Sequence, residues 1–380
     1  MGLVATLQSG ALLGGCAPVL RGATTTCPQD TDETGGVDWI PSVLHPVFYG
    51  YQDLGEANGV PRFDSTENRV RIWYPSHDGA PLNAPILKLC VARWPLVLFL
   101  HGQPPGQPPC LNPDYYQHWF WLPMTLARSG YVVVVPAYTA EVPETDVMPF
   151  GWPFTVVDWV RRHWENATWV DQRPESTATV GHSYGALRAV RAALARPQIS
   201  AVASLGANWT DLGGTAERVL RSIRAPSFFM WKPGSEDLDA ANGLWNVVSA
   251  PKYGAEYRGE HFDYISDEPN CDEPRGTCTA MERAAAELVA LFISRFTPVR
   301  VSEDRINRRI PLGLLPAPVV QTDRQKFYSG GHLTADGCLQ TLNWLSTDGQ
   351  CTVGVPRDKE CRINLRWAVS GVEGSRIFGG

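Results

Sequence analysis

Short runs of consecutive apolar residues recur along this chain, separated by segments in which apolar residues follow helical spacing. The runs at 96–100 and 131–135 consist almost entirely of aliphatic and aromatic residues. Such unbroken runs are typical of parallel strands covered on both faces, because a half-exposed strand alternates apolar with polar residues. Strands separated by helices build a mostly parallel sheet with helices on both faces. The pattern therefore predicts an α/β protein with a doubly wound sheet.

The other elements are predicted from the same two periods. Residues 70–74 alternate and predict a half-exposed strand. Further short strands are predicted at 177–180, 201–205 and 227–231. Apolar residues at helical spacing predict four helices, at 114–128, at 154–164, after Gly185 and at 281–296.

Changes in composition divide the 380 residues into three predicted parts. Residues 1–36 combine an apolar, signal-like start with a polar tether, and residues 37–298 contain the predicted α/β domain. After that point prolines accumulate and the period is lost, which indicates a linker. We expect residues 299–380 to form this linker and a small, disulfide-tied, β-rich module.

The cysteines and the N-terminal segment both indicate an oxidising compartment. Residues 3–20 carry no charge, like the apolar region of a signal peptide. Residues 13–16 resemble the lipobox of bacterial lipoproteins, in which Cys16 would carry a lipid; a plain signal peptide is the alternative. We expect a secreted, periplasmic or envelope-attached protein.

Nine cysteines are many for a cytosolic enzyme, and without Cys16 eight remain, an even number suited to disulfides. A bridge between Cys271 and Cys278 would predict that reduction lowers activity before it melts the core. A zinc site is not expected, because the candidate ligands are loosely spaced. These are His332, Cys338, Cys351 and Cys361.

The formal net charge is −6, and the chain has no block of Lys or Arg. This charge pattern argues against nucleic acid as a partner. We expect a monomer that acts on a small or neutral molecule.

Ser183 lies at the centre of Gly181-His182-Ser183-Tyr184-Gly185, the only G-x-S-x-G sequence in the chain. The predicted strand 177–180 runs directly into this sequence, and a predicted helix follows it. A serine on a sharp turn from strand to helix is held in a strained conformation that exposes its hydroxyl, and flanking glycines allow close approach of substrate and backbone. The alternative is a serine that only caps the helix. The context favours Ser183 as a nucleophile.

A serine hydroxyl needs a general base within hydrogen-bond reach. If the chain order is nucleophile, acid, base, only His261 and His332 follow Ser183. His261 lies in a polar, turn-like stretch at 254–264, between the last predicted sheet strand and the final helix, whereas His332 lies in the predicted tail module. We favour His261 as the base.

The acid that orients the base should follow the strand at 227–231. Three carboxylates lie there, at Glu236, Asp237 and Asp239. Asp237 is preferred, and the other two remain alternatives, since acids near the start of a helix also have a capping role.

An oxyanion that develops in the reaction needs preorganised N–H donors. One predicted donor is the backbone N–H of Tyr184, which follows the nucleophile. The other comes from the loop after 96–100, His101-Gly102-Gln103-Pro104-Pro105-Gly106. Its two prolines have no N–H, so Gln103 is the expected donor.

Together these residues resemble the α/β-hydrolase superfamily over residues 37–298. The chain looks most like the branch with lipases, cutinase-like polyesterases and platelet-activating-factor acetylhydrolases, on the strength of Arg71-Ile72-Trp73-Tyr74-Pro75, the His101-Gly102 loop and residues 181–185. The resemblance implies an α/β-hydrolase fold, with Ser183 as nucleophile, Asp237 as acid, His261 as base, and Gln103 with Tyr184 as the oxyanion hole. No cofactor or metal is implied.

The resemblance implies a serine esterase that hydrolyses small-molecule or polymeric esters through an acyl-enzyme. Trp209 and Trp231 follow strand ends and are expected to line the acyl pocket. No long insertion separates the strands at 201–205 and 227–231, so a large lid is not expected. Hydrolysis of amides or peptides by the same residues is one alternative. A non-catalytic binding protein on this fold is another.

Overall fold

The computed structural model describes the N-terminal half of the chain more fully than its C-terminal tail. The described residues are 36–39, 48–62, 68–76, 81–88, 93–102, 115–117, 121–138, 153–232, 234, 236–238, 243–249, 251–257, 261, 279–297, 299–302, 352–353, 361–369 and 372–376. The predicted signal segment, lipid attachment at Cys16 and the bridge between Cys271 and Cys278 lie outside them. So do Asp239, His332 and Gln103. These predictions stay predictions.

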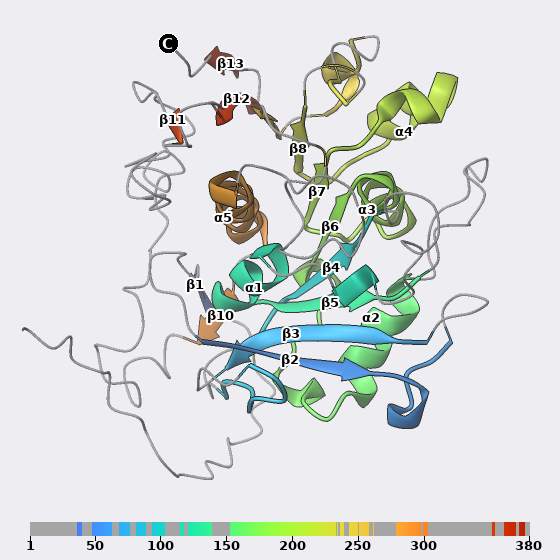
Figure 1. The fold of residues 1–380 in the computed structure, drawn as a ribbon, viewed down its shortest axis with the longest axis vertical. Helices are drawn as coiled ribbons and strands as arrows, with labels where there is room; N and C mark the ends of the chain where they lie inside the picture. Colours follow the sequence, from blue (N-terminus) through green and yellow to red (C-terminus); the bar gives the residue numbers. More distant parts are fainter. Residues whose placement is uncertain are drawn as a thin grey trace, which may run out of the picture. The chain divides into compact units, whose positions relative to one another are not determined.

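A mostly parallel sheet forms the centre of the described fold (Figure 1). Its strands are β2 (Phe48–Leu54), β3 (Val70–Ser76), β4 (Leu96–Leu100), β5 (Val132–Pro136), β6 (Thr177–His182), β7 (Ala201–Leu205), β8 (Ser227–Trp231) and β9 (Lys252–Tyr257). Their order across the sheet is β2-β3-β5-β4-β6-β7-β8-β9. The strands from β5 to β9 in this order run parallel, and β3 and β2 join antiparallel at one edge.

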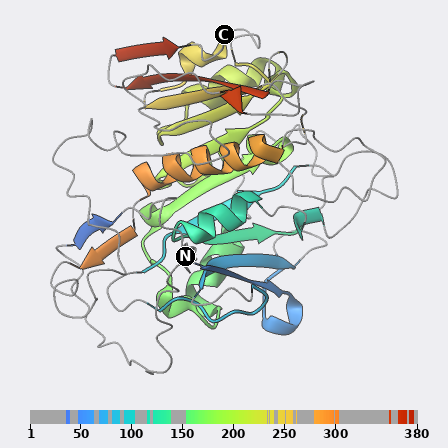
Figure 2. The same cartoon turned by 60° about the vertical axis from the view of Figure 1, so that its left-hand side comes forward.

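Helices cover both faces of this sheet. The helices α1 (Trp121–Arg128) and α5 (Thr279–Phe296) lie beside each other on one face, which Figure 2 shows. The other face carries α2 (Pro153–His163), α3 (Tyr184–Ala195) and α4 (Ala216–Arg221) (Figure 1). None of the described helices is long and apolar enough to cross a membrane. The predicted α/β class is confirmed, with helices on both faces of a mostly parallel sheet.

The core consists of two layers because successive strand side chains point to opposite faces. In β4, Leu98 packs in the layer under α2, α3 and α4, while Val97 and Phe99 pack in the layer under α1 and α5. This double burial explains the unbroken apolar sequence of the strand. Short 3₁₀ helices complete the described elements: η1 (Glu56–Asn58), η2 (Tyr115–Gln117), η3 (Ala167–Trp169), η4 (Pro174–Ser176), η5 (Trp209–Thr215) and η6 (Leu244–Val247).

Two element predictions were wrong in detail. The strand predicted to be half-exposed is β3, and all of it is buried. Its alternating polar residue, Arg71, lies over the rings of Tyr51 and Trp73 and pairs with Asp53, so β2 covers it. The helix predicted at 114–128 is shorter, because a 3₁₀ turn precedes α1.

The stretch that looked turn-like before His261 contains a strand. β9 pairs in parallel with β8 and extends the sheet beyond the last strand that the sequence predicted. Gly254 in β9 faces two indole rings, and a Cβ there would come within 2.5 Å of Trp231 and 3.0 Å of Trp245. Gly254, the first residue of the stretch expected to be turn-like, therefore makes room for packing within a strand.

Strands from the C-terminal segment continue the sheet beyond β9. β12 (Cys361–Val369) pairs antiparallel with β9 and also with β11 (Thr352–Val353) and β13 (Val372–Arg376). A separate two-stranded sheet joins β1 (Gly36–Trp39) to β10 (Val299–Ser302). The described part of the tail thus adds strands to the main sheet, and the predicted separate β module stays a prediction.

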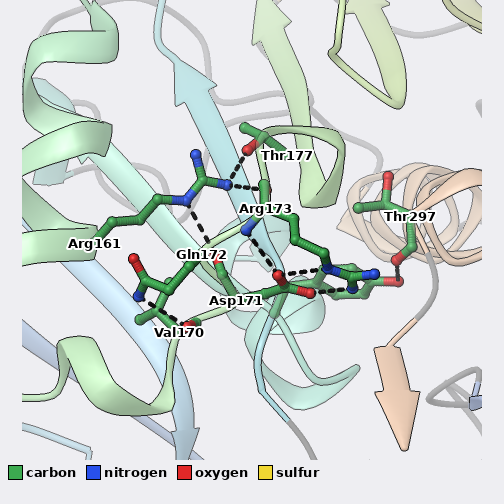
Figure 3. Close-up of polar contacts among 8 residues, drawn as sticks. Arg161, Val170, Asp171, Gln172, Arg173, Thr177 and Thr297 are labelled. Atoms are coloured by element: carbon green, nitrogen blue, oxygen red, sulfur yellow. Dashed lines mark hydrogen bonds and ion pairs between the residues drawn. The ribbon is translucent and has the colours of Figure 1, made fainter. Parts of the chain in front are cut away.

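A polar network holds the connection between α2 and β6 (Figure 3). Arg161 of α2 donates hydrogen bonds to the carbonyl oxygens of Asp171 and Arg173 and to the Thr177 hydroxyl, at 3.0, 2.7 and 2.5 Å. Asp171 accepts from the backbone and guanidinium of Arg173. Burial would raise the pKa of Asp171, but hydrogen bonds from Arg173 and Ser176 outweigh it and hold this pKa below its usual value. The network fixes the start of β6, the strand that leads to Ser183.

Candidate active site

Ser183 occupies the turn between β6 and α3, as the sequence predicted. Its backbone angles are φ 55° and ψ −125°, and among the described non-glycine residues only Asn83 also has a positive φ. A serine in this region is strained, and such strain persists only where the surrounding structure enforces it. The Ser183 N–H donates to the carbonyl of Leu205 in β7 at 2.8 Å, and this bond helps hold the turn.

The two glycines of the motif let α3 pack closely against the sheet. A Cβ on Gly181 would lie 2.0 Å from the carbonyl oxygen of Gly185, and a Cβ on Gly185 would lie 2.0 Å from that of Leu100. No side chain fits at either position. The predicted close approach of the backbone is therefore confirmed for the described residues, and it fixes Ser183 relative to β4 and β6.

His261, far downstream in the chain, lies against Ser183. Its Nε2 is 3.0 Å from Ser183 Oγ, and its Nδ1 is 2.6 Å from Glu236 Oε1. The His261 side chain is 28% exposed and that of Glu236 is 10% exposed, so the pair is accessible at the imidazole and shielded at the carboxylate. With Nδ1–H donating to Glu236, the Nε2 lone pair accepts the Ser183 hydroxyl proton.

The carboxylate that contacts His261 Nδ1 is that of Glu236. This corrects the prediction, which preferred Asp237. Glu236 Oε2 also accepts the backbone N–H of Lys232 at 2.8 Å, so each carboxylate oxygen has a donor. The Asp237 N–H donates to the carbonyl of Gly234 at 3.0 Å in the turn after β8. Gly234 has a φ of +116°, which shapes this turn. Glu236 is one of the two alternatives that the sequence left open, and its longer side chain reaches the imidazole from the turn.

The loop after β4 comes close to the nucleophile at Gly102. A Cβ on Gly102 would lie 2.9 Å from the Ser183 Cβ, so only glycine fits. Gln103, the predicted second oxyanion donor, follows directly in the chain but lies outside the described residues. Tyr184 opens α3, so its N–H is at the positive end of the helix dipole. The described residues are thus compatible with an oxyanion hole beside Ser183.

Buried side chains support this loop from behind. The His101 imidazole stacks on Tyr138 at 3.9 Å, and its Nδ1–H donates to the Gly102 carbonyl at 2.7 Å. The Tyr138 hydroxyl donates to the His101 carbonyl, and Arg188 of α3 lies over the Tyr138 ring at 4.6 Å. Burial lowers the pKa of His101 to about 3 and raises that of Tyr138 to about 12. Both groups are therefore neutral near pH 7.

Trp209 and Trp231 do not have the predicted position along an acyl pocket. Trp209 is 2% exposed and Trp231 is 1% exposed, and both pack in the core layer under α2, α3 and α4. The Trp209 ring packs edge to face on Phe229, and the ring centres of Trp231 and Trp245 lie 6.0 Å apart. The prediction from strand ends was wrong because these indoles point into the core instead of over the edge of the sheet.

Two residues that sequence reasoning did not single out also contact the base. His182 Nε2 is 2.9 Å from the carbonyl oxygen of His261. Gly206, with a φ of +61°, lies against both imidazoles, and a Cβ there would be 3.3 Å from His261 Cε1. The signals for them were present, since His182 precedes the nucleophile and Gly206 follows the strand beside it.

The arrangement places a strained hydroxyl within hydrogen-bond distance of an imidazole, and the imidazole within hydrogen-bond distance of a carboxylate. Within the described residues no cluster of three or more potential metal ligands occurs.

Compared with known proteins, the chain matches no protein-family model and no curated protein sequence.

Proposed function

We propose that this protein is a serine hydrolase of the α/β-hydrolase fold that cleaves carboxylic esters. The observation that carries the proposal is the hydrogen-bonded series from Ser183 through His261 to Glu236, with Ser183 held at a positive φ. The order nucleophile, acid, base along the chain and the positions of all three after sheet strands support it.

In the proposed reaction, Ser183 Oγ attacks the ester carbonyl while His261 Nε2 takes the hydroxyl proton. The tetrahedral intermediate collapses to an acyl-enzyme, and the protonated His261 gives its proton to the departing alcohol. Water then attacks the acyl group with His261 as base again, and the carboxylic acid leaves. Glu236 keeps the Nδ1 proton in place and stabilises the imidazolium in both halves of the reaction.

The backbone N–H of Tyr184 is the proposed first donor to the oxyanion, because it follows Ser183 at the N-terminus of α3. The loop that begins at Gly102 supplies the second donor in this proposal. The closeness of Gly102 to the Ser183 Cβ supports that assignment, because a Cβ on Gly102 would lie only 2.9 Å from it.

The test is a pair of measurements on the wild-type protein and Ser183→Ala. We expect the wild type to hydrolyse p-nitrophenyl esters and to be labelled by a fluorophosphonate probe. Ser183→Ala is expected to lose about 10,000-fold in turnover, with unchanged melting, because the nucleophile is removed and the fold is not.

Other results would separate the alternatives. Faster cleavage of p-nitroanilides than of matched esters would make the protein an amidase with the same triad. No labelling of the folded wild type would contradict a catalytic function and favour a binding protein. A chain-length series of esters on the active protein would then define the acyl group that it accepts.

A further inference from the structure

A second histidine lies beside the imidazole of the triad. His182 is fully buried at the end of β6, and its ring lies 4.8 Å from that of His261, centre to centre. The carbonyl oxygen of His261 lies 2.9 Å from His182 Nε2. A carbonyl oxygen only accepts, so Nε2 carries the proton and donates.

The position of this hydrogen bond distinguishes it from ordinary core contacts. It joins the strand that carries the nucleophile to the main chain of the base itself, across 79 residues of sequence. The His261 side chain, in contrast, forms hydrogen bonds to Ser183 and Glu236. His182 therefore restrains the His261 backbone, from which the side-chain geometry follows.

Burial keeps the His182 imidazole neutral. Desolvation, reinforced by the neighbouring His261, lowers the pKa of His182 well below its usual value, against the effect of its hydrogen bond. The ring therefore stays neutral while the adjacent imidazole takes up a proton during catalysis. Gly102 and Gly206 lie close to this ring, and a Cβ on either would be 3.2 to 3.4 Å from a ring atom. This packing leaves the ring little room to turn.

We propose that His182 is a positioning residue, which holds the His261 main chain through its Nε2–H so that the imidazole stays in line with Ser183. The inference rests on the proposed serine hydrolase function. Without this bond, His261 would retain its side-chain partners but its backbone would move, and proton transfer depends steeply on alignment.

Three substitutions at this site separate the hydrogen bond from the volume of the ring. The amide of His182→Gln places a donor near the Nε2 position and is expected to keep kcat within about threefold of wild type. His182→Asn has the same chemistry but a shorter reach, and His182→Leu has no donor. Both are expected to lower kcat and the rate of fluorophosphonate labelling by about five- to tenfold, with little change in KM.

Melting temperatures measured in parallel separate positioning from stability. A purely structural role would make loss of rate follow loss of stability in all three variants. Equal rates for His182→Asn and His182→Gln, or an unimpaired His182→Leu, would overturn the inference while the esterase activity stands. An inactive, folded wild type would instead overturn the proposed function and this inference with it.

A measurement on the wild type does not depend on how the variants fold. Nitrogen NMR of the buried imidazole is expected to show the neutral form with the proton on Nε2. A proton on Nδ1 at neutral pH would contradict the hydrogen bond to His261 and the role assigned to it.

Discussion

The Glu236 carboxylate has a fixed orientation, because its two oxygens accept from different parts of the chain. Oε1 faces the His261 imidazole, and Oε2 accepts the Lys232 N–H at 2.8 Å. A charge-assisted bond from a backbone N–H is short and directional, so the turn after β8 sets the plane of the carboxylate. The orientation of the base is thus tied to the end of a buried strand.

Separate substitution of the two adjacent acids tests the proposal that Glu236 is the acid that orients His261. Glu236→Gln should lower kcat about 1,000-fold or more, because an amide presents the wrong partner to the Nδ1 proton and disfavours the required tautomer. Asp237→Asn is the matched control and should stay within a few-fold of wild type. Steady-state hydrolysis of a p-nitrophenyl ester measures both. A larger loss in Asp237→Asn would return the acid role to that residue.

At the level of single side chains, the sequence predicted that Ser183 and His261 lie together, because few residues could satisfy the motif and the chain order, and the structure places them in hydrogen-bond contact. It could not choose among neighbouring carboxylates. Glu236 and Asp237 differ by one residue, and which of them reaches the imidazole depends on the turn at Gly234, whose φ is +116°. Backbone angles of this kind have no signature in composition or period.

Among the elements, the connection from α2 to β6 depends on one buried cation. Arg161 is 7% exposed and donates to two carbonyl oxygens and the Thr177 hydroxyl. Burial lowers its pKa from the usual value, while Asp171 and Asp158 oppose that shift. Because Arg161 is buried, its loss leaves these acceptors without their donor and should cost more than the loss of an exposed arginine.

Arg161→Met is expected to lower the free energy of unfolding by about 2–4 kcal/mol, because it leaves buried acceptors unsatisfied. Arg161→Lys should lower the free energy of unfolding less, because the lysine ammonium can still donate to some of the three oxygen acceptors of Arg161. Urea unfolding measures both. The proposed esterase activity of the folded Met variant should change little, because the described contacts of Arg161 include neither Ser183, His261 nor Glu236. An unchanged unfolding midpoint would contradict the role of the network.

A second pair of elements links the tail to the sheet. β12 pairs with β9 in antiparallel register from Ile363 opposite Tyr257 to Ala368 opposite Lys252. β9 in turn leads toward His261. An uncovered edge of this length is a site for association with other chains.

Truncation of the chain after residue 302 should therefore expose the edge of β9, lower stability and promote association. Light scattering and thermal melting of the truncated and full-length proteins check this expectation. Leu365→Pro in the full-length chain is the matched variant, since it removes pairing capacity opposite Ala255 and keeps the tail. A monomeric truncated protein with unchanged melting would show that β12 contributes nothing to the edge.

Local patterns predicted the buried strands and missed β9 for a physical reason. β4 and β5 are apolar runs that are recognisable alone. β9 contains Lys252, Gly254 and Glu256, and it becomes a strand through pairing with β8 and with the distant β12. β3 was assigned correctly as a strand but with the wrong exposure, because Tyr51 and Asp53 of β2 cover its Arg71.

For the molecule as a whole, two buried neutral histidines make folding sensitive to acid. Burial lowers the pKa of both His101 and His182. In the unfolded chain both histidines titrate near pH 6.5. Below that pH the unfolded state therefore binds more protons than the folded state. Stability is fully present above about pH 6.5 and falls as the pH falls toward the folded pKa, which for His101 is about 3.

Urea unfolding at several pH values between 6.5 and 4.5 should show this loss. Each histidine contributes a slope of up to about 1.4 kcal/mol per pH unit. Asp158 and Asp171, whose pKa values lie below the usual carboxylate range, lose their contribution only under more acidic conditions. His182→Gln should remove the contribution of one histidine to this slope, which is up to about 1.4 kcal/mol per pH unit. A flat profile over this range would mean that both imidazoles are accessible to protons in the folded state.

The pairing of β1 with β10 sets Gly36 opposite Ser302. Directly opposed residues of antiparallel strands are about 5 Å apart, so the polypeptide enters and leaves the intervening segment through almost the same point. A chain segment whose two ends lie at neighbouring points can be spliced into a loop of a host protein without stretching it. Fluorophores attached at these two positions would stay in contact in the native state and separate on unfolding, which would turn the strand pair into a reporter of folding.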